Sequence, residues 1–230
     1  SLILEPGWLK LFKTDLSFRK YSSELNILNK NKVDYKVLNT SEIMKMVPEL
    51  QVKFVNGVLF KNSIRVNSPL KLSKKYFDYF LKKGGKYINY NCKDLRYIKN
   101  YWDVITGNNT KLKYDEVVIA TGPWSRKFLS NLGYNIPLAL ERGYHHHYST
   151  KDKVSITPVI HDVEGGFVYS SLGNEIRITS GVELNFFEAS PNENQISEVI
   201  EKLSKILPLN KKMTSTAWVG SRPTLIDSMP

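Results

Sequence analysis

The sequence predicts a mixed fold, α/β in one part and α+β in the other, in which a doubly wound segment is interleaved with a mostly antiparallel β-sheet. The apolar run Val117–Ile119 leads into the small residues Ala120–Gly122 and then into a short helical stretch that Gly133 closes. That order is typical of a strand buried on both faces of a parallel sheet. From Leu138 onward, apolar and polar residues alternate between turn dipeptides, which is typical of antiparallel strands with one buried face.

The first fifty residues predict one strand and two helices. Leu2–Phe12 is apolar and predicts a strand, which a polar turn at Lys13–Asp15 ends. Leu16–Asn31 carries its apolar residues at helical spacing and predicts one amphipathic helix. A second, short helix is expected to begin with Ser41 as its N-cap and to end at Pro48.

The middle of the chain predicts a longer helix followed by a β-meander. After a strand at Gly57–Phe60, Pro69 is expected at the first position of a helix that Gly84 and Gly85 close. Strands are predicted over Tyr87–Tyr97, Tyr101–Thr106 and Leu112–Tyr114. This meander leads back to the apolar run that ends at Ile119.

The second half predicts a sheet with one covering helix. Strands are expected over Leu138–Tyr148, Ile156–His161, Phe167–Ser171, Glu175–Glu183 and Thr214–Val219, with hairpin turns at Gly165-Gly166 and Gly173-Asn174. Pro191–Leu207 predicts an amphipathic helix with Ser190 as its N-cap.

Composition limits the classes of protein to consider. The chain has 230 residues, 41% of them hydrophobic, and a formal net charge of +11 from 33 Lys and Arg against 22 Asp and Glu. An excess of positive charge can indicate binding to nucleic acid or to anionic lipid. Lysines alternate here with apolar residues and form no long block, so a composition rich in Lys and Asn is the favoured interpretation. The single cysteine, Cys92, excludes an intramolecular disulfide and a zinc site built from cysteines.

The most informative motif closes the chain. The sequence W-V-G-S-R-P-T-L-I-D-S-M-P places Arg222 between Gly220 and Pro223. Glycine permits a ligand to approach the backbone, and arginine offers a planar fork of donors that fits a carboxylate. The alternative is an edge strand that ends at Pro223 and carries a surface arginine. Asp227 is interpreted as a turn or helix-capping residue.

Several motifs together resemble one family. V-V-I-A-T-G-P-W-S, L-G-Y-N-I-P-L, E-R-G-Y-H and the closing motif follow one another in the order and approximate spacing of the FAD-dependent D-amino acid oxidase superfamily. The bacterial D-amino acid dehydrogenase branch, near glycine oxidase and sarcosine oxidase, is the most similar part of that superfamily. The resemblance runs from about Gly7 to the end of the chain. It implies FAD as cofactor and the oxidation of a small, D-configured amino acid to its imino acid by hydride transfer to flavin.

The resemblance also implies a domain plan. Residues 1–60 and 136–221 would belong to the substrate domain, residues 61–135 to the FAD-binding domain, and residues 222–230 would return towards the FAD-binding domain. The G-x-G-x-x-G loop that holds the FAD pyrophosphate in this family does not occur in this sequence. We therefore expect this chain to be an internal part of a longer protein, and the isolated chain to be inactive.

The site residues implied by the resemblance fall into two groups. Arg222 would bind the substrate carboxylate, and Tyr144 or His145 would shape the substrate pocket. The residues expected near FAD are Ala120, Thr121, Gly122, Trp124, Leu95 and Gly220, although the spacing from Gly85 to Leu95 is one residue longer than the family pattern. No side chain is assigned to catalysis, because the flavin itself accepts the hydride. The expected electron acceptor is oxygen or a quinone chain, and the expected location is cytoplasmic, with peripheral association at the inner face of a bacterial membrane as a variant.

Other interpretations stay open. On a strand, His145 and His147 would share one face, as two metal ligands can, but no third ligand has suitable spacing and a metal is not favoured. No role is assigned to His146. Arg142, beside Glu141, is interpreted as one half of a structural ion pair. A degenerate, cofactor-free binding protein of the same fold and a basic nucleic-acid-binding module are the alternative functions, although no nucleic-acid partner is expected.

Overall fold

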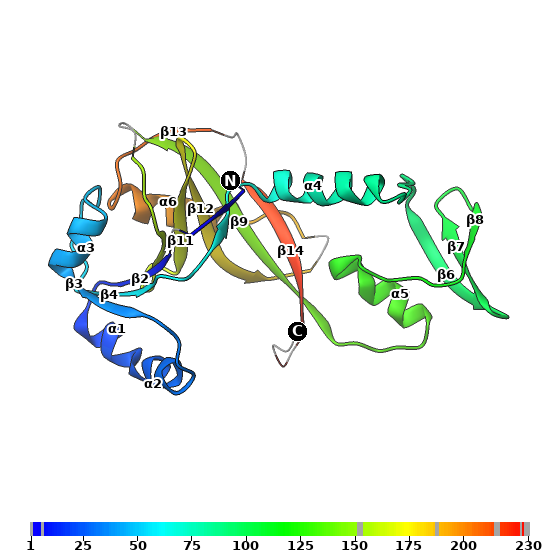
Figure 1. Cartoon of the computed structure of the whole chain (residues 1–230), viewed down its shortest axis with the longest axis horizontal. Coiled ribbons are helices and arrows are strands. Elements are labelled where there is room, and N and C mark those ends of the chain that lie inside the picture. The colour runs from blue at the N-terminus through cyan, green and yellow to red at the C-terminus, as the bar shows by residue number, and fades with distance from the viewer. Residues whose placement is uncertain are drawn as a thin grey trace. The chain divides into compact units, whose positions relative to one another are not determined.

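The computed structural model of the chain describes residues 2–5, 7–150, 154–186, 189–213, 217–225 and 227 (Figure 1). The chain forms two compact units, each assembled from three separate stretches of sequence. Unit 1 comprises residues 1–73, 143–182 and 190–219, and unit 2 comprises residues 74–142, 183–189 and 220–230. The chain therefore passes from one unit to the other several times.

Most of a mostly antiparallel sheet lies in unit 1, and residues 138–142, 183–184 and 220–225 of the same sheet belong to unit 2. The strands of this sheet are β2 (Trp8–Phe12), β3 (Lys36–Asn39), β4 (Asn56–Phe60), β9 (Leu138–Thr150), β10 (Val159–Asp162), β11 (Phe167–Leu172), β12 (Glu175–Leu184) and β13 (Leu209–Lys212). They lie in the order β13-β9-β12-β11-β10-β2-β4-β3, and β14 (Trp218–Leu225) pairs with β9. Only the β10–β2 pair is parallel among the pairs whose register is described. The prediction of a mixed fold with a mostly antiparallel sheet is confirmed.

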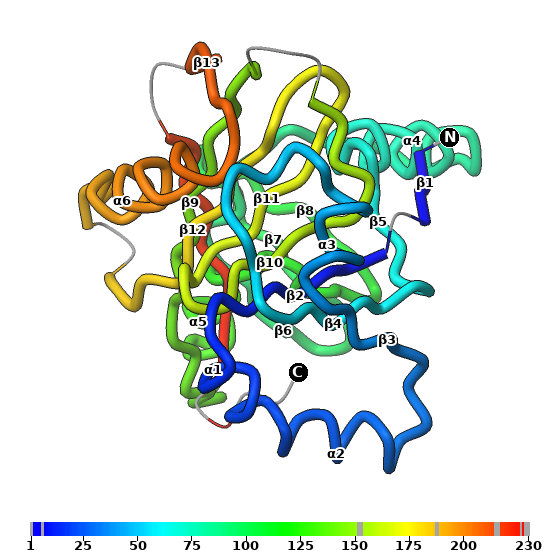
Figure 2. The backbone as a smooth tube through the Cα atoms, turned by 90° about the vertical axis from the view of Figure 1, so that its left-hand side faces the viewer, coloured from blue at the N-terminus to red at the C-terminus, as the bar shows by residue number. Residues whose placement is uncertain are grey.

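The alternation of side chains explains which face of the sheet is buried. Leu9 and Leu11 of β2, Ile160 of β10 and Ile176 and Ile178 of β12 are completely buried, while their neighbours along each strand face the other way. Helix α6 (Glu193–Ser204) adds its apolar side chains to this same core and lies beside β9 and β12 (Figure 2). Each such apolar side chain contributes about 1.5–3 kcal/mol when it leaves water, so one face of the sheet accounts for most of the stability of unit 1.

The helix predicted over Leu16–Asn31 is divided at Tyr21. Helix α1 (Asp15–Lys20) ends there and α2 (Ser22–Lys30) begins, because the Tyr21 backbone N–H bonds to the Phe18 carbonyl in a tight turn. Contacts outside the helices fix this residue: the Lys10 Nζ donates to the Tyr21 hydroxyl at 2.9 Å, and the Tyr21 and Phe12 ring centroids are 5.2 Å apart. A tertiary anchor therefore overrides the helical periodicity.

Helix α3 (Thr40–Met46) has its N-cap two residues earlier than the predicted Ser41. The N-cap is Asn39, whose side-chain oxygen accepts the Glu42 N–H at 3.0 Å while the Glu42 carboxylate accepts the Asn39 N–H at 3.0 Å. This capping box satisfies two free helix donors at once, which a serine at position 41 could not do with Glu42 only one residue away. A small pair, β1 (Ile3–Leu4) with β5 (Arg65–Val66), completes unit 1.

Unit 2 contains most of helix α4 (Pro69–Lys82) and a separate three-stranded sheet. The sheet is the antiparallel meander β6 (Cys92–Ile98), β7 (Tyr101–Thr106) and β8 (Lys111–Tyr114) that the sequence predicts. It is followed by the 3₁₀ turn η1 (Gly122–Trp124) and helix α5 (Ser125–Asn131). Strand β6 begins five residues later than the predicted start at Tyr87.

The apolar run Val117–Ile119 does not form the predicted buried strand. These residues are irregular, and the Val118 side chain is 87% exposed. A strand needs a neighbour for its backbone N–H and C=O groups, and no strand of the described residues pairs with this run. The last predicted strand also differs: residues 214–216 lie outside the described residues, and β14 continues through Pro223 to Leu225. Proline is compatible with this position because β14 pairs on one side only, with β9.

Candidate functional site

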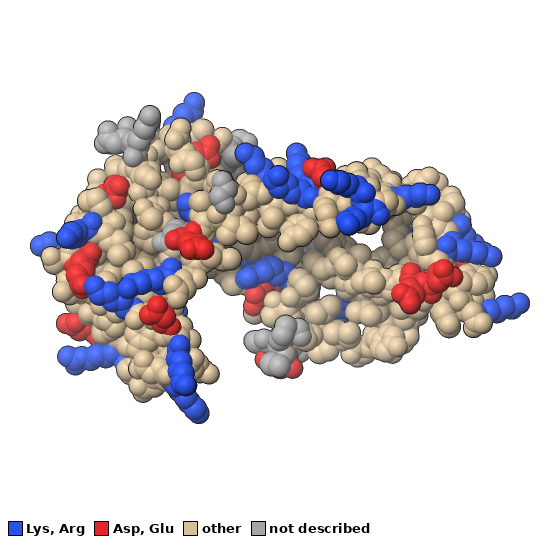
Figure 3. Space-filling model, in the orientation of Figure 1, with Lys and Arg blue, Asp and Glu red and all other residues tan. Residues whose placement is uncertain are grey.

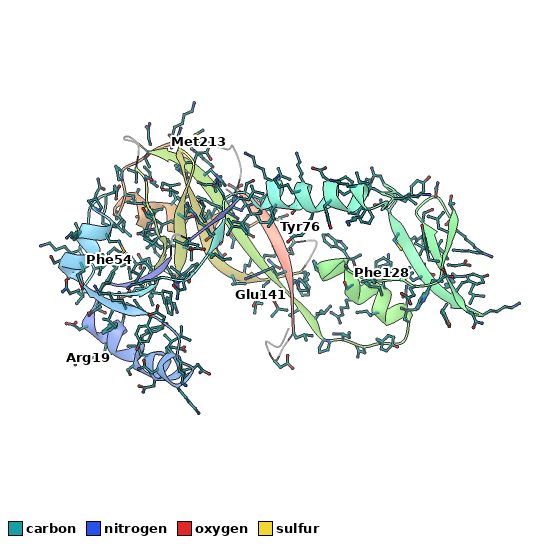
Figure 4. All side chains as sticks on the ribbon, viewed as in Figure 1. Arg19, Phe54, Tyr76, Phe128, Glu141 and Met213 are labelled. Carbon is teal, nitrogen blue, oxygen red and sulfur yellow. The ribbon has the colours of Figure 1, made fainter. Side chains whose placement is uncertain are left out.

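The small residues that follow the apolar run line an open cavity in unit 2. A cavity of about 700 Å³ has nine lining residues: Tyr90, Asn91, Cys92, Ala120, Thr121, Gly122, Trp124, Lys127 and Phe128. Four of the six residues that the sequence predicts to lie near a cofactor are therefore together. Phe128 is the one buried residue of α5 and fixes that helix beside the cavity (Figure 4).

The backbone of this cavity wall is unusually accessible. Gly122 has a φ of 55°, in the left-handed region that favours glycine. A Cβ atom placed on Gly122 would meet no atom within 4 Å, so the space beside this backbone is free for a ligand. The hydroxyl groups of Thr121 and Ser125 lie 3.1 Å apart and join the turn to the start of α5. This part of the cavity wall is thus a short turn whose backbone at Gly122 is accessible to a ligand.

The remaining lining residues set the polarity of the cavity. Aromatic side chains at Tyr90, Trp124 and Phe128 are suited to contact with a flat ring, and Lys127 supplies a positive charge. Burial raises the pKa of the Cys92 thiol, which is therefore neutral near pH 7 and acts as an apolar part of the wall. A second cavity of about 470 Å³ shares Ala120 and Gly122 and is closed on another side by residues of β14.

Leu95 and Gly220 are placed differently from the other predicted cofactor residues. Leu95 is buried and pairs with Val104 in the meander, and of the described residues neither Leu95 nor Gly220 lines either cavity. A β-bulge lies between Cys92 and Asp94, just before Leu95. Cys92 and the two residues before it line the larger cavity.

Arg222 lies on β14 opposite Glu141 of β9. Its Nη2 donates to the Glu141 Oε2 at 3.3 Å, with the two side chains 70% and 28% exposed. Figure 4 shows Glu141 where β9 and β14 run together. Among the described residues one nitrogen makes this contact, which leaves the other donors of the guanidinium for a planar anion.

Arg142, the next residue of β9, has the opposite environment. Its side chain is 3% exposed, pairs with Glu183 at 3.4 Å and donates to the Ala189 carbonyl at 2.8 Å. Successive side chains of a strand face opposite sides, which is why Arg142 cannot pair with Glu141 as the sequence order alone had indicated. Arg142 is a structural ion-pair residue, but its partner is Glu183.

Tyr144 and His145 also separate onto opposite faces of β9. Tyr144 is 1% exposed, and its hydroxyl accepts the Asn192 N–H at 3.0 Å, within the core that α6 covers. His145 is on the accessible face, where its ring lies 4.7 Å from the ring of Trp218. Of these two predicted substrate residues, only His145 can contact a ligand directly.

The environment of His145 keeps it neutral. Burial, and then the charge of Arg177, lowers the pKa of His145 to about 4. Its Nδ1 lies 3.3 Å from the Arg177 Nη2, so Nδ1 accepts this hydrogen bond and the ring proton is on Nε2. Arg177 had no motif to mark it in the sequence. The available signal was its position in E-I-R-I, where it alternates with buried isoleucines.

The histidine run is not a metal site within the described residues. His145 and His147 share a face, as predicted, with ring centroids 5.4 Å apart. However, His147 pairs with Glu175 at 2.8 Å, and no group of three or more His, Cys, Asp or Glu that could hold a metal occurs in the part of the chain that the structure describes. His146 is buried in the core, and burial lowers its pKa.

Two further properties bear on the class of protein. None of the helices in the described ranges is both long and apolar enough to cross a bilayer. On the face shown in Figure 3, Lys and Arg side chains are spread over many elements, with Asp and Glu between them. This dispersed charge does not favour a nucleic-acid-binding module, which concentrates basic residues on one surface.

Comparison with known proteins gives a family match over the whole chain. A family model described as DAO, FAD dependent oxidoreductase, matches residues 2–230. The D-amino-acid oxidase of Bradyrhizobium diazoefficiens is 23% identical over 200 residues, which cover 84% of this chain and 47% of the relative. The D-amino acid dehydrogenase 1 of Mesorhizobium japonicum is 24% identical over 232 residues, covering 97% of this chain and 55% of the relative. The chain thus spans about half the length of the curated relatives it matches.

A solved structure gives the same fold. The glycine oxidase of Geobacillus kaustophilus superposes with a TM-score of 0.87 at 16% identity, over 100% of this chain and 62% of that protein. At this identity the likeness concerns the fold alone. It extends over both units of the chain.

Proposed function

This chain belongs to the DAO family of FAD-dependent oxidoreductases, and from that membership we propose that the whole protein oxidises the C–N bond of a small D-amino acid. The resemblance noted in the sequence is confirmed at the level of the family, whose cofactor is FAD. The preference for a D-amino acid is supported by the names of the two curated relatives. The observation in this chain that carries the proposal is the open guanidinium of Arg222.

The residues of the larger cavity fit a flavin nucleotide. We propose that the backbone at Ala120, Thr121 and Gly122 lies against FAD, because small residues and an open left-handed glycine allow close approach. Trp124 would contact the cofactor with its ring, and Lys127 is suited to one of its phosphates. We propose that Leu95 and Gly220 contact FAD through their backbone groups only.

Arg222 is proposed to bind the substrate carboxylate. A guanidinium fork can hold both carboxylate oxygens and thereby fixes the orientation of the α-carbon, which a lysine cannot do as well. His145 is proposed to contact the substrate with its imidazole ring, which is neutral at pH 7. Tyr144 is proposed to act indirectly, by holding the start of α6 through Asn192.

The chemistry divides between the cofactor and the chain. FAD, when bound, supplies the oxidant that accepts the hydride of the substrate α-carbon. The chain's own residues orient the substrate and neutralise its carboxylate, and no side chain is assigned to proton removal. A substrate bound with a neutral amine needs no side-chain base to form the imino acid. Oxygen or a quinone would be the electron acceptor.

A cofactor-free binding protein of the same fold is the second candidate. An enzyme of the proposed kind must bind FAD, whereas the degenerate protein would bind an amino acid without it. The two candidates therefore differ in one property, the visible absorption of bound flavin.

The test uses the purified whole protein. We expect it to carry the absorption of bound flavin, and anaerobic D-alanine to bleach that absorption faster than L-alanine. The Arg222→Met variant should keep the flavin but bleach at least about tenfold more slowly, because a charged bidentate contact to the substrate is lost. Arg19→Met, a change of an exposed arginine on α1, is the matched control and should behave as the wild type. A protein without flavin, or one whose bleaching is unaffected by Arg222→Met, would contradict the proposal.

A further inference from the structure

Arg177 on β12 is a partly buried cation for which the described residues provide no carboxylate partner. Burial lowers the pKa of its guanidinium, and its Nε is buried with no acceptor among those residues. None of the ion pairs found among the described residues includes Arg177. The nearest acid on the same strand face, Glu175, pairs instead with His147.

An arrangement of this kind has an energetic cost. An arginine stays ionised in proteins, and a charge removed from water without a partner destabilises the fold. Sheets can avoid this cost by placing an arginine at an exposed edge, but β12 lies between β9 and β11 inside the sheet. An external anion would supply the missing partner.

The neighbours of Arg177 provide further donors on the same face. Ser170 of β11 is directly opposite Arg177 in the strand register, with its side chain on the outer face and partly exposed. On the other side, His145 accepts from the Arg177 Nη2 through Nδ1, which leaves the Nε2–H of the ring as a donor. We call Arg177, His145, Ser170 and Trp218 the Arg177 patch.

Trp218 gives the Arg177 patch an apolar side. Its indole is 58% exposed and lies over His145 with the ring centroids 4.7 Å apart and the planes at 30°. An exposed indole beside a cation is a common arrangement for binding an organic ion, because the ring contacts the apolar part of the ligand.

The charge of the patch selects the kind of anion. His145 is neutral at pH 7, because its pKa is lowered to about 4, and Arg177 therefore supplies a single positive charge. Glu175 and His147 next to it form a separate, internally paired couple. One positive charge in a planar fork matches a carboxylate better than the double charge of a phosphate.

We propose that the Arg177 patch binds the carboxylate of a small organic ligand whose apolar part lies on Trp218. The residues of the Arg177 patch all belong to unit 1, and its cation is Arg177, a different arginine from the Arg222 of the proposed function, although both proposals include His145. The proposal holds whether or not the protein carries FAD, and it goes beyond the proposed amino acid oxidation.

The experiment measures the binding of phenylacetate to the whole protein by isothermal titration calorimetry. Phenylacetate should bind, while its amide, phenylacetamide, and inorganic phosphate should each bind at least about tenfold more weakly, because the amide has no charge and phosphate has no apolar part to contact Trp218. Arg177→Met should weaken phenylacetate binding by about tenfold or more, and Arg177→Lys should give an intermediate loss, since the charge remains without the fork. Arg19→Met, at an exposed arginine outside both proposed sites, should leave the affinity unchanged.

Three results would overturn the proposal. The first is a wild type that does not bind phenylacetate, the second is phosphate that binds equally well, and the third is binding that Arg222→Met abolishes while Arg177→Met leaves it intact. Thermal unfolding of each variant shows whether it is folded, and the lysine variant keeps the test valid where Arg177→Met does not fold. Failure of the flavin test with intact phenylacetate binding would overturn the proposed function alone.

Discussion

Arg222 and Glu141 are joined by a single contact, from Nη2 to Oε2 at 3.3 Å, between strands β14 and β9. An ion pair this exposed contributes little to folding, typically below about 1 kcal/mol. The ion pair is therefore significant for two other reasons: it orients the Arg222 guanidinium, and it keeps the Glu141 carboxylate beside that guanidinium. A ligand of Arg222 meets a cation and an anion together, and an amino acid bound with a neutral amine offers a carboxylate to the first and an N–H donor to the second.

Replacing Glu141 by Gln should change the selectivity of the proposed enzyme more than its stability. Without the carboxylate, propionate should inhibit several-fold more strongly relative to the affinity for D-alanine, because repulsion of a simple anion is removed together with attraction of the amine. The ratio of the propionate inhibition constant to the D-alanine KM measures this effect. An unchanged ratio would show that Glu141 does not face the ligand.

Replacing Arg222 by Lys should raise the KM for D-alanine by about tenfold and also lower kcat. Lysine keeps the charge, but it cannot hold both oxygens of a carboxylate and so fixes the substrate less well. Steady-state kinetics give both constants, and the flavin absorption checks that the cofactor site is intact. Arg19→Lys is the control, with kinetics expected to match the wild type.

Replacing Arg142 by Met should destabilise the chain strongly, by about 3 kcal/mol, because the Glu183 carboxylate, which is 11% exposed, loses the neighbouring guanidinium charge. Changing Glu183 to Gln in the same chain should recover part of this loss. Urea unfolding of the two single variants and the double variant gives the coupling energy. Additive losses would mean that the 3.4 Å contact carries no energy of its own.

Replacing Tyr144 by Phe should cost about 1 kcal/mol of unfolding free energy, because the Asn192 N–H loses its acceptor while the ring remains in the core. Tyr114→Phe, at an exposed tyrosine of β8, is the matched control and should be neutral. If Tyr144 contacted the substrate directly, the variant would instead change KM without changing stability.

The lowered pKa of His145 predicts a pH dependence of stability. The unfolded chain takes up a proton near pH 6.5, whereas the folded chain does so near pH 4. The stability linked to His145 is therefore complete above about pH 6.5 and is lost as the pH falls towards 4. Urea unfolding at pH 7 and pH 5 should show a smaller loss in His145→Gln than in the wild type. An equal loss in both would mean that other groups, such as His146 and His161, account for it.

The strands of the second half could be predicted from sequence because their alternation is local. Ile176 and Ile178 face the core in the way that E-I-R-I-T indicates, and the turn at Gly173 lies where the sequence placed it. The strand predicted over Val117–Ile119 was wrong for the opposite reason. A strand forms only beside a neighbouring strand, and no local pattern reveals whether one is present. Tyr21 divided a predicted helix through contacts with residues of β2, which are equally invisible in a local window.

The candidate site shows the same division. Ala120–Gly122 and Arg222 could be named from their motifs, because the chemistry of small residues and of a guanidinium is readable in sequence. The partner of Arg222 could not, since Glu141 lies 81 residues away. Arg177 was missed because a single arginine in an alternating strand looks like an ordinary surface residue until burial and the missing partner are known.

The buried side chains of β9 fix the register of this strand. Odd positions from Glu141 to His147 face one side and even positions the other, with Arg142, Tyr144 and His146 all buried. Deleting a single residue here would turn a guanidinium, a phenol and an imidazole out to solvent and bring a carboxylate in. Side chains can therefore be exchanged along this strand, but a residue can be gained or lost only together with a compensating bulge.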